Sequence, residues 1–366
     1  MAIAPKVYSH YVTVGKKGDK QLLVEYKNAI YSTMVAALLY YCKFAESLEM
    51  NEFIMNPYDP CVWNKIINGK QCTICFHVND CKISHVSAEV LDNIIAWLRE
   101  EYENVFTDGS GKMKVARGKV HKYLGMTLDF TVKYVVKVTM IEYVNEIIAS
   151  WDKACLDFDD GFEILNNRKK LAMLAPEDLF KVDESGVKLG SAKAKVFHTI
   201  MAKALYVSKW ARPDTSLAIV FLTTRVREPD EDDWTKLRHL IVYLKSTREL
   251  PLVLGAWNTG VLHWYVDASF AVHPNMQGHT GAVLTLGTGA PVVTSTKQKL
   301  NTCSSTISEV VAVDDMIPQI LWTWLFMQEQ GIKVTDNILY QDNKSAILLE
   351  KNGWASSSKP TKHIKI

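Results

Sequence analysis

The sequence predicts an α/β (α+β) protein with an antiparallel sheet in its first part, a helical connection, and a C-terminal mixed sheet with flanking helices. Strand-like and helical patterns alternate over residues 60–140, and helical periodicity then dominates to about residue 250. Strand-like segments and a long apolar helix follow. We therefore expect three domains, residues 1–153, 154–250 and 251–366.

Composition limits the partners and the compartment. The 366 residues are 48% hydrophobic, which supports real cores, and the net charge is only +2, so a nucleic acid would be held by local basic patches. No apolar run approaches the roughly 18 residues of a membrane span, and the first residues lack the apolar core of a signal peptide. Seven thinly spread cysteines indicate reduced thiols. We expect an intracellular protein, in cytoplasm or nucleus, with no membrane partner and no secretion.

The first part combines two helices with several strands. Asn68-Gly69 is a strong two-residue hairpin signal, and Ser87 is a candidate N-cap. The elements expected in order are a helix over 20–50, strands over 61–67 and 71–78, a helix over 87–106, two or three short strands within 119–140, and a helix over 139–153.

The rest of the chain changes from helical to mixed periodicity near Pro251. Helices are expected over 194–210, 214–227 and 230–247, and tryptophans 210, 234, 264, 322 and 324 are expected at core positions. The last part should contain strands over 250–256, 261–270, 278–287 and 290–298, a helix over 305–329, a strand over 337–342 and a helix over 343–353.

The stretch "CTICFHVNDCKISH" interrupts an apolar run at Asn79-Asp80. Two interpretations remain open at this point. The pair can be a tight hairpin turn, since asparagine tolerates positive φ, or it can be an acidic metal-binding turn in which one acid is replaced.

Three carboxylates of the last part stand where elements of a mixed sheet can converge. Asp267 ends the strand "HWYVDAS", Asp342 ends "ILYQDN", and Glu309 lies in the first turns of the helix after "CSSTIS". Carboxylates that meet repel one another unless a cation neutralises them. Mg²⁺ prefers such oxygen ligands, and two ions about 4 Å apart stabilise a phosphoryl displacement. The alternative is that each acid is a solvated cap of its own element.

The segments "WYVDASFAVH", "STKQKLNTCSSTISEVVAV" and "YQDNKSAI" resemble the ribonuclease H domain of copia-type retrotransposon polyproteins. "NAIYSTMVAALLYYCKFAESLEMNEFIMNPYDPCVWNK" and "HKYLGMTLDF" resemble the segments on either side of the reverse transcriptase active-site turn. "ALYVSKWARPDTSLAIVFLTTRVREPDEDDWTKLRHLIVYLKST" resembles the helical segment that joins the two enzymes. The resemblance implies partial reverse transcriptase fingers and palm in 1–153, a thumb or connection region in 154–250, and a ribonuclease H-like domain, truncated at its C-terminal end, in 251–366.

The resemblance also implies a reaction and its site. Asp267, Glu309 and Asp342 would be the catalytic residues and would bind two Mg²⁺ (or Mn²⁺) ions, and the substrate would be the RNA strand of an RNA–DNA hybrid. Ile307 stands where the family usually has a further glutamate. A fourth aspartate is expected beyond "TKHI", where the sequence stops, so we expect weakened metal affinity.

The neighbouring residues Lys297 and Gln298 lie in a stretch that could contact the nucleic-acid backbone. The alternative for this pair is a solvated strand end.

In the same family the palm turn reads aromatic-x-Asp-Asp, and His77-Val78-Asn79-Asp80 occupies that position. Asp80 would be the remaining metal ligand of this degraded turn. Asn79 keeps one oxygen but loses the unit charge, which is most of the attraction for a hard dication. The family's other palm aspartate has no counterpart upstream, and "YKNAIYST" departs from the usual glycine-containing motif. We therefore expect no DNA synthesis.

Two hypotheses follow. The chain is a retrotransposon-derived fragment in which metal-dependent ribonuclease H activity survives, or it is a catalytically dead transposon relic or nucleic-acid-binding remnant.

Overall fold

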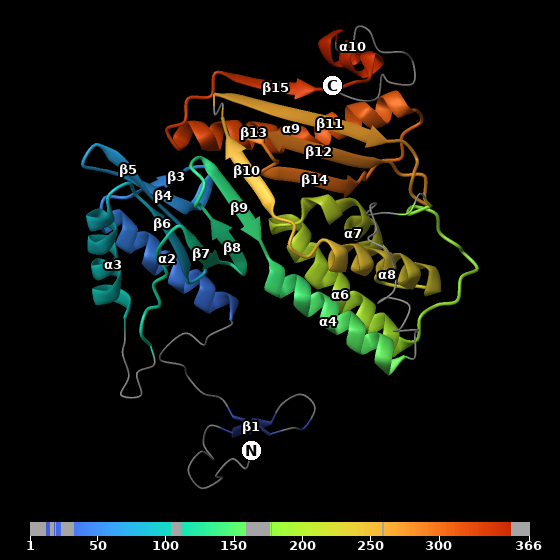
Figure 1. Ribbon diagram of the computed structural model, residues 1–366, viewed down its shortest axis with the longest axis horizontal. Coiled ribbons are helices and arrows are strands. Elements are labelled where there is room, and N and C mark those ends of the chain that lie inside the picture. The colour runs from blue at the N-terminus through green and yellow to red at the C-terminus, as the bar shows by residue number, and fades with distance from the viewer. Residues whose placement is uncertain are drawn as a thin grey trace. The chain divides into compact units, whose positions relative to one another are not determined.

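The computed structural model describes residues 12–14, 18, 20–22, 33–103, 111–158, 176, 178–257 and 260–352 (Figure 1). The chain forms two compact units, Met1–Trp97 and Leu98–Ile366, which divide inside a helix. The segment "YKNAIY" and the "TKHI" motif lie outside the described residues. The predicted α/β (α+β) class is confirmed, whereas the three-domain division stays a prediction.

The first unit contains an antiparallel four-stranded sheet in the order β3-β4-β5-β6. Its described elements are β1 (Val12–Val14), β2 (Lys20–Leu22), α2 (Met34–Met50), β3 (Ile54–Asn56), β4 (Asp59–Ile67), β5 (Lys70–His77), β6 (Asp80–Ser84) and α3 (Ala88–Tyr102). Phe44 of α2 packs edge-on against Phe76 of β5, with ring centroids 4.8 Å apart. The predicted helix over 20–50 is wrong at its start, because residues 20–22 form a strand and Thr33 caps α2 by accepting a hydrogen bond from the Ala36 amide.

Two hairpin turns decide how this sheet is connected. Asn68 and Gly69 both have positive φ, as the two-residue hairpin signal predicts. In the next hairpin His77 pairs with Asp80, so the turn residues are Val78 and Asn79. The positive φ of 54° falls on Val78, where a β-branched side chain is strained. The predicted Asn79-Asp80 turn is therefore one residue off, because the ladder extends to Asp80.

The second unit contains two sheets and several helices. Its remaining elements are β7 (Val120–Tyr123), β8 (Met126–Asp129), β9 (Val135–Thr139), α4 (Ile141–Asp157), α6 (Ser191–Trp210), the 3-10 helix η2 (Pro213–Thr215), α7 (Ser216–Thr223), α8 (Glu231–Ser246), β10 (Leu252–Ala256), β11 (Val261–Ser269), β12 (His279–Thr285), β13 (Gly287–Thr288), β14 (Val292–Lys297), α9 (Ser305–Glu329), β15 (Asp336–Tyr340) and α10 (Lys344–Asn352). One sheet has the order β13-β10-β9-β8-β7, and the other has the order β14-β12-β11-β15.

The helical part of this unit shares one core with the five-stranded sheet. Trp151 of α4 packs on Trp234 of α8 at 4.6 Å between ring centroids. The acidic run before Trp234 starts α8 with a capping box, since Asp230 and Asp233 accept each other's backbone amides and both pair with Arg225.

The tryptophans predicted for the core divide into two groups. Trp234 and Trp264 are buried, as predicted. Trp324 is partly buried and packs against the core, whereas Trp210 and Trp322 are 38% and 37% exposed, so the prediction is wrong for those two. A helical stripe does not distinguish a core face from an exposed apolar one.

The long helix α9 covers one face of the mixed sheet (Figure 1). The sequence analysis expected no apolar segment of membrane-spanning length, but the length and composition of α9 would allow it to cross a membrane. Its apolar residues, however, form one core with β11 and β12; the buried set is Leu262, Trp264, Val266, Ala282, Leu284, Ala312, Val313, Met316, Ile320, Met327 and Val334. These contacts make α9 the core helix of this part of the unit.

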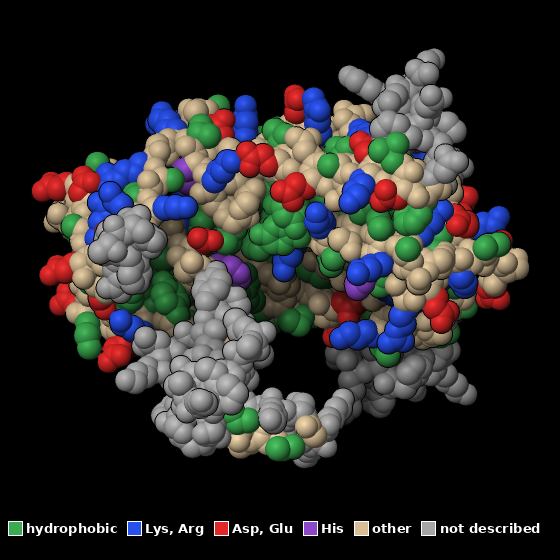
Figure 2. Space-filling view, turned by 90° about the horizontal axis from the view of Figure 1, so that it is seen from below, with side chains coloured by type: hydrophobic (Ala, Val, Ile, Leu, Met, Phe, Trp, Pro, Cys, Tyr) green, Lys and Arg blue, Asp and Glu red, His purple; other side chains and the backbone are tan. Residues whose placement is uncertain are grey.

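Charged side chains of both signs are interspersed on the face of the molecule that Figure 2 shows. Among the described side chains on that face, no large area of one sign dominates, in keeping with the net charge of +2.

Two buried histidines join the mixed sheet to the helical part of the same unit. His273 Nε2 lies 3.1 Å from His279 Nδ1, and His279 Nε2 lies 2.8 Å from Ser295 Oγ. The ring of Phe180 packs edge-on against both imidazoles. Burial lowers the pKa of both histidines to about 4, helped at His273 by the nearby charges of Lys297 and His279.

We predict that the stability of the folded protein decreases as the pH is lowered, because of this histidine pair. Both imidazoles are neutral in the folded protein, whereas the unfolded chain takes up protons near pH 6.5, so their contribution is complete above about pH 6.5 and is lost as the pH falls to about 4. Urea unfolding of the wild type and of the His273→Gln/His279→Gln variant across this range measures the effect. The double variant should have the flatter profile, and His198→Gln, at an exposed position, should match the wild type. Equal slopes for all three proteins would contradict the prediction.

Candidate metal centre

Two of the three predicted carboxylates reach the same edge of the mixed sheet through parallel pairing. β11 pairs in parallel with β15, and Tyr265 lies opposite Tyr340. Asp267 and Asp342 each follow that pair by two residues. Because side chains two residues apart along a strand share a face, the register directs both aspartates to one side of one edge, although Asp342 already lies beyond β15.

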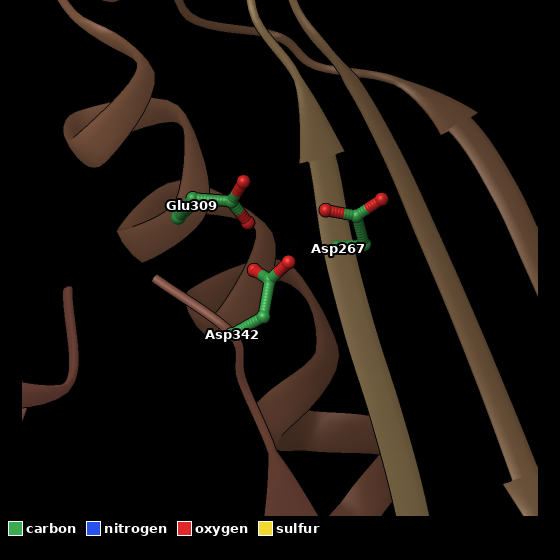
Figure 3. A group of neighbouring side chains, drawn as sticks. All are labelled: Asp267, Glu309 and Asp342. Carbon is green, nitrogen blue, oxygen red and sulfur yellow. The ribbon is translucent and has the colours of Figure 1, made fainter. Parts of the chain in front are cut away.

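The third carboxylate comes from the start of α9. Ser304 caps this helix, since its hydroxyl accepts a hydrogen bond from the Ile307 amide at 3.3 Å. Glu309 lies in the second turn, just before the segment of α9 that packs on β11 and β12. Docking of α9 therefore brings Glu309 to the strand ends that carry the aspartates, and Figure 3 shows the three side chains directed toward a common space.

The three carboxylates form one compact group with unequal environments. Each offers an oxygen, and these oxygens all lie within 4.8 Å of one another. Asp267 and Asp342 are exposed, whereas Glu309 is 6% exposed. Burial raises the pKa of Glu309, and the charges of Asp267 and Asp342 raise it further. Hydrogen bonds from Gln341 Nε2, at 3.1 Å, and from the Ala268 backbone oppose this shift in part.

This donor set fits a hard divalent cation. It consists of carboxylate oxygens only, which Mg²⁺ and Mn²⁺ prefer, and it concentrates negative charge that a cation would neutralise. Within the described residues it is the one group of three or more histidine, cysteine or acidic side chains with ligand atoms this close. The structure thus brings together all three residues that the sequence analysis selected.

The predicted nucleic-acid contacts have different environments. Lys297 is half-buried at the end of β14, and burial lowers its pKa. Gln298 is 1% exposed, and its amide is hydrogen-bonded inside the domain to Thr280 and Ser308. A contact between Gln298 and nucleic acid would require these bonds to open.

The degraded polymerase turn does not gather ligands among the described residues. Asp80 is exposed at the first position of β6, and Asn79 occupies the turn. No group of three potential ligands forms around Asp80 in the ranges that the structure describes.

One site residue, Gln341, was not selected from the sequence. Its position next to Asp342, in "YQDN", was the available signal. Its side chain holds Glu309 and also accepts the Asn343 amide through Oε1 at 3.0 Å.

We predict that Glu309→Gln stabilises the metal-free protein at pH 7 and removes its stabilisation by Mn²⁺. The substitution replaces a buried charge that two aspartates repel, while the amide keeps the shape of the side chain. Thermal unfolding with EDTA and with MnCl₂ measures both effects. A lower melting temperature in EDTA, or an unchanged response to Mn²⁺, would contradict this account of the site.

Comparisons with known proteins give several relatives among retrotransposon Pol polyproteins. No family model matches the chain. A retrovirus-related Pol polyprotein from transposon TNT 1-94 of Nicotiana tabacum is 23% identical over 355 residues, which are 95% of this chain and 25% of that protein. The Pol polyprotein from transposon RE2 of Arabidopsis thaliana is 31% identical over 145 residues, 39% of this chain and 10% of that protein.

A yeast relative has a more similar length. The putative transposon Ty5-1 protein of Saccharomyces cerevisiae is 23% identical over 249 residues, 68% of this chain and 73% of that protein. Among solved structures, a foamy viral protease-reverse transcriptase in complex with double-stranded DNA matches 86% of this chain and 44% of its own, with 11% identity and a TM-score of 0.45. The chain spans a quarter or less of the two plant polyproteins. Over nearly its whole length the chain is a relative of retrotransposon Pol polyproteins of the copia type, as its motifs indicate.

Proposed function

We propose that the second unit is a metal-dependent nuclease of the ribonuclease H type, which hydrolyses the RNA strand of an RNA–DNA hybrid. The convergence of Asp267, Glu309 and Asp342 at one edge of the mixed sheet carries this proposal. The similarity to retrotransposon Pol polyproteins supports the substrate class, because such elements pass through RNA–DNA hybrids.

The residues at this site would have different roles in metal binding and positioning. Asp267, Glu309 and Asp342 would hold two Mg²⁺ or Mn²⁺ ions. When bound, such ions would lower the pKa of a water molecule and neutralise negative charge on the phosphate. Gln341 and the Ala268 backbone keep the buried Glu309 carboxylate in place. The two exposed aspartates leave the site open to a polynucleotide backbone. Recognition would rest on phosphates and sugars and would be largely blind to sequence.

The second candidate is a nucleic-acid-binding remnant without catalysis. Asn79 in the polymerase turn favours it, because there a charged ligand of the family is replaced by a neutral amide. The two candidates differ in whether the Asp267 carboxylate is needed for strand cleavage.

We predict that the chain cleaves the RNA strand of a labelled RNA–DNA hybrid with Mg²⁺ or Mn²⁺, and that Asp267→Asn lowers kcat by about 100-fold or more, since a lost ligand should exceed the 10- to 100-fold effect of outer contacts. Gel analysis of the labelled RNA strand measures this. Asp314→Asn, at an exposed position of α9 outside the group, is the matched control and should cleave like the wild type.

Equal cleavage by the wild type and Asp267→Asn would point to a contaminating nuclease. Absence of cleavage by every protein, together with retained hybrid binding, would favour the non-catalytic candidate.

We further infer that the chain does not synthesise DNA. Asn79 stands in place of the charged turn residue, and Asp80 is drawn into the strand ladder opposite His77. We predict no incorporation of labelled deoxynucleotides on a primed RNA template with either metal ion. Incorporation by the wild type that disappears in Asp80→Asn would refute this inference.

A further inference from the structure

Gln298 lies inside the mixed-sheet module, directly beside the start of α9. Its side chain is 1% exposed, and its backbone amide donates to Gly278 O at 2.9 Å. Its side-chain Nε2 donates to Ser308 O at 2.8 Å, and its Oε1 accepts the Ser308 hydroxyl at 2.9 Å. The side-chain amide of Gln298 is therefore hydrogen-bonded to both the backbone carbonyl and the hydroxyl of Ser308 in α9.

A second contact fixes α9 further along. Gln298 Nε2 also donates to Thr280 Oγ1 at 3.2 Å, and the Thr280 hydroxyl donates to Asp315 Oδ2 at 3.2 Å. Asp315 lies two helical turns after Ser308 on the same helix. Ser308 and Thr280 are fully buried, so these bonds are shielded from competing water.

We call the hydrogen bonds of the Gln298 side chain to Ser308 and Thr280 the clamp. The neighbouring backbone at Gly278 leaves the space that the Gln298 side chain occupies. A Cβ atom on Gly278 would lie 2.3 Å from Gln298 Oε1 and 2.6 Å from Ser308 Oγ. Gly278 does not have a positive φ, so the glycine is required there for space and not for backbone conformation. Three separate segments of the module therefore meet around the Gln298 amide.

We propose that Gln298 is a positioning residue of the nuclease site and does not contact the nucleic acid. Ser308 immediately precedes Glu309, so the grip on Ser308 sets the rotation of α9 at the residue that supplies the buried carboxylate. A slip of one residue would turn the helix by about 100° and carry Glu309 away from Asp267 and Asp342. This inference rests on the proposed nuclease function.

The test compares Gln298→Ala with the wild type for Mn²⁺ affinity, by calorimetric titration, and for kcat and KM on the hybrid, all well below the melting temperature. We expect Mn²⁺ affinity and kcat to fall by about tenfold or more, with KM for the hybrid changed by less than about twofold. Ser308→Ala removes only the hydroxyl that donates to Gln298 Oε1, and it should give an intermediate loss of Mn²⁺ affinity and kcat. Leu284→Ala, in the same core but away from the clamp, should lower the melting temperature without changing Mn²⁺ affinity.

A higher KM with unchanged kcat in Gln298→Ala would overturn the proposal in favour of a direct nucleic-acid contact. Unchanged Mn²⁺ affinity and kcat with a lower melting temperature would overturn it in favour of a purely structural role. Should Gln298→Ala fail to fold, Ser308→Ala decides in the same way. If Asp267→Asn binds Mn²⁺ and cleaves the hybrid as the wild type does, the proposed function itself is refuted, and this inference with it.

Discussion

Parallel pairing of β11 with β15 is the constraint on which the candidate metal centre depends. The two strands are separated in sequence by β12, β13, β14 and α9, and they lie side by side because α9 returns the chain from β14, at one edge of the sheet, to β15 at the other. A crossover between parallel strands needs a dozen or more residues and is usually an α-helix, whose apolar face then packs on the sheet. The same crossing places the first turns of α9 at the ends of the paired strands, so the topology brings Glu309 into the neighbourhood of Asp267 and Asp342.

The burial of Glu309 gives the three carboxylates different roles. A cation held only by exposed aspartates would compete with water for every ligand, whereas a buried carboxylate beside two exposed ones offers a charge that water neutralises poorly. The hydrogen bond from Gln341 keeps one Glu309 oxygen oriented. The position of Glu309 thus has to be fixed from inside the module, and the polar contacts around Gln298 and Ser308 are suited to that task.

Local signals in the sequence predicted the elements of this module better than its contacts. The expected helix over 305–329 matches α9, because Ser304 provides a cap that is visible in the sequence. The strand ends that carry the two aspartates were also visible as breaks in apolar runs. The burial of Gln298 was not, since it depends on Gly278 and Ser308, which tertiary structure alone brings together. The shift of the turn to Val78-Asn79 has the same origin, because ladder pairing at Asp80 overrides the turn preference of asparagine.

The two candidate metal sites differ in what the fold requires of their residues. A hairpin turn accepts asparagine as readily as aspartate, so Asn79 is compatible with the sheet whether or not a metal binds nearby. The carboxylate group at the mixed sheet is different, because its members repel one another and one of them is buried. The fold gains no stability from that arrangement, and a neutral residue at any of the three positions would relieve it. Binding of a divalent cation, which suits these carboxylate oxygens, would relieve the same repulsion.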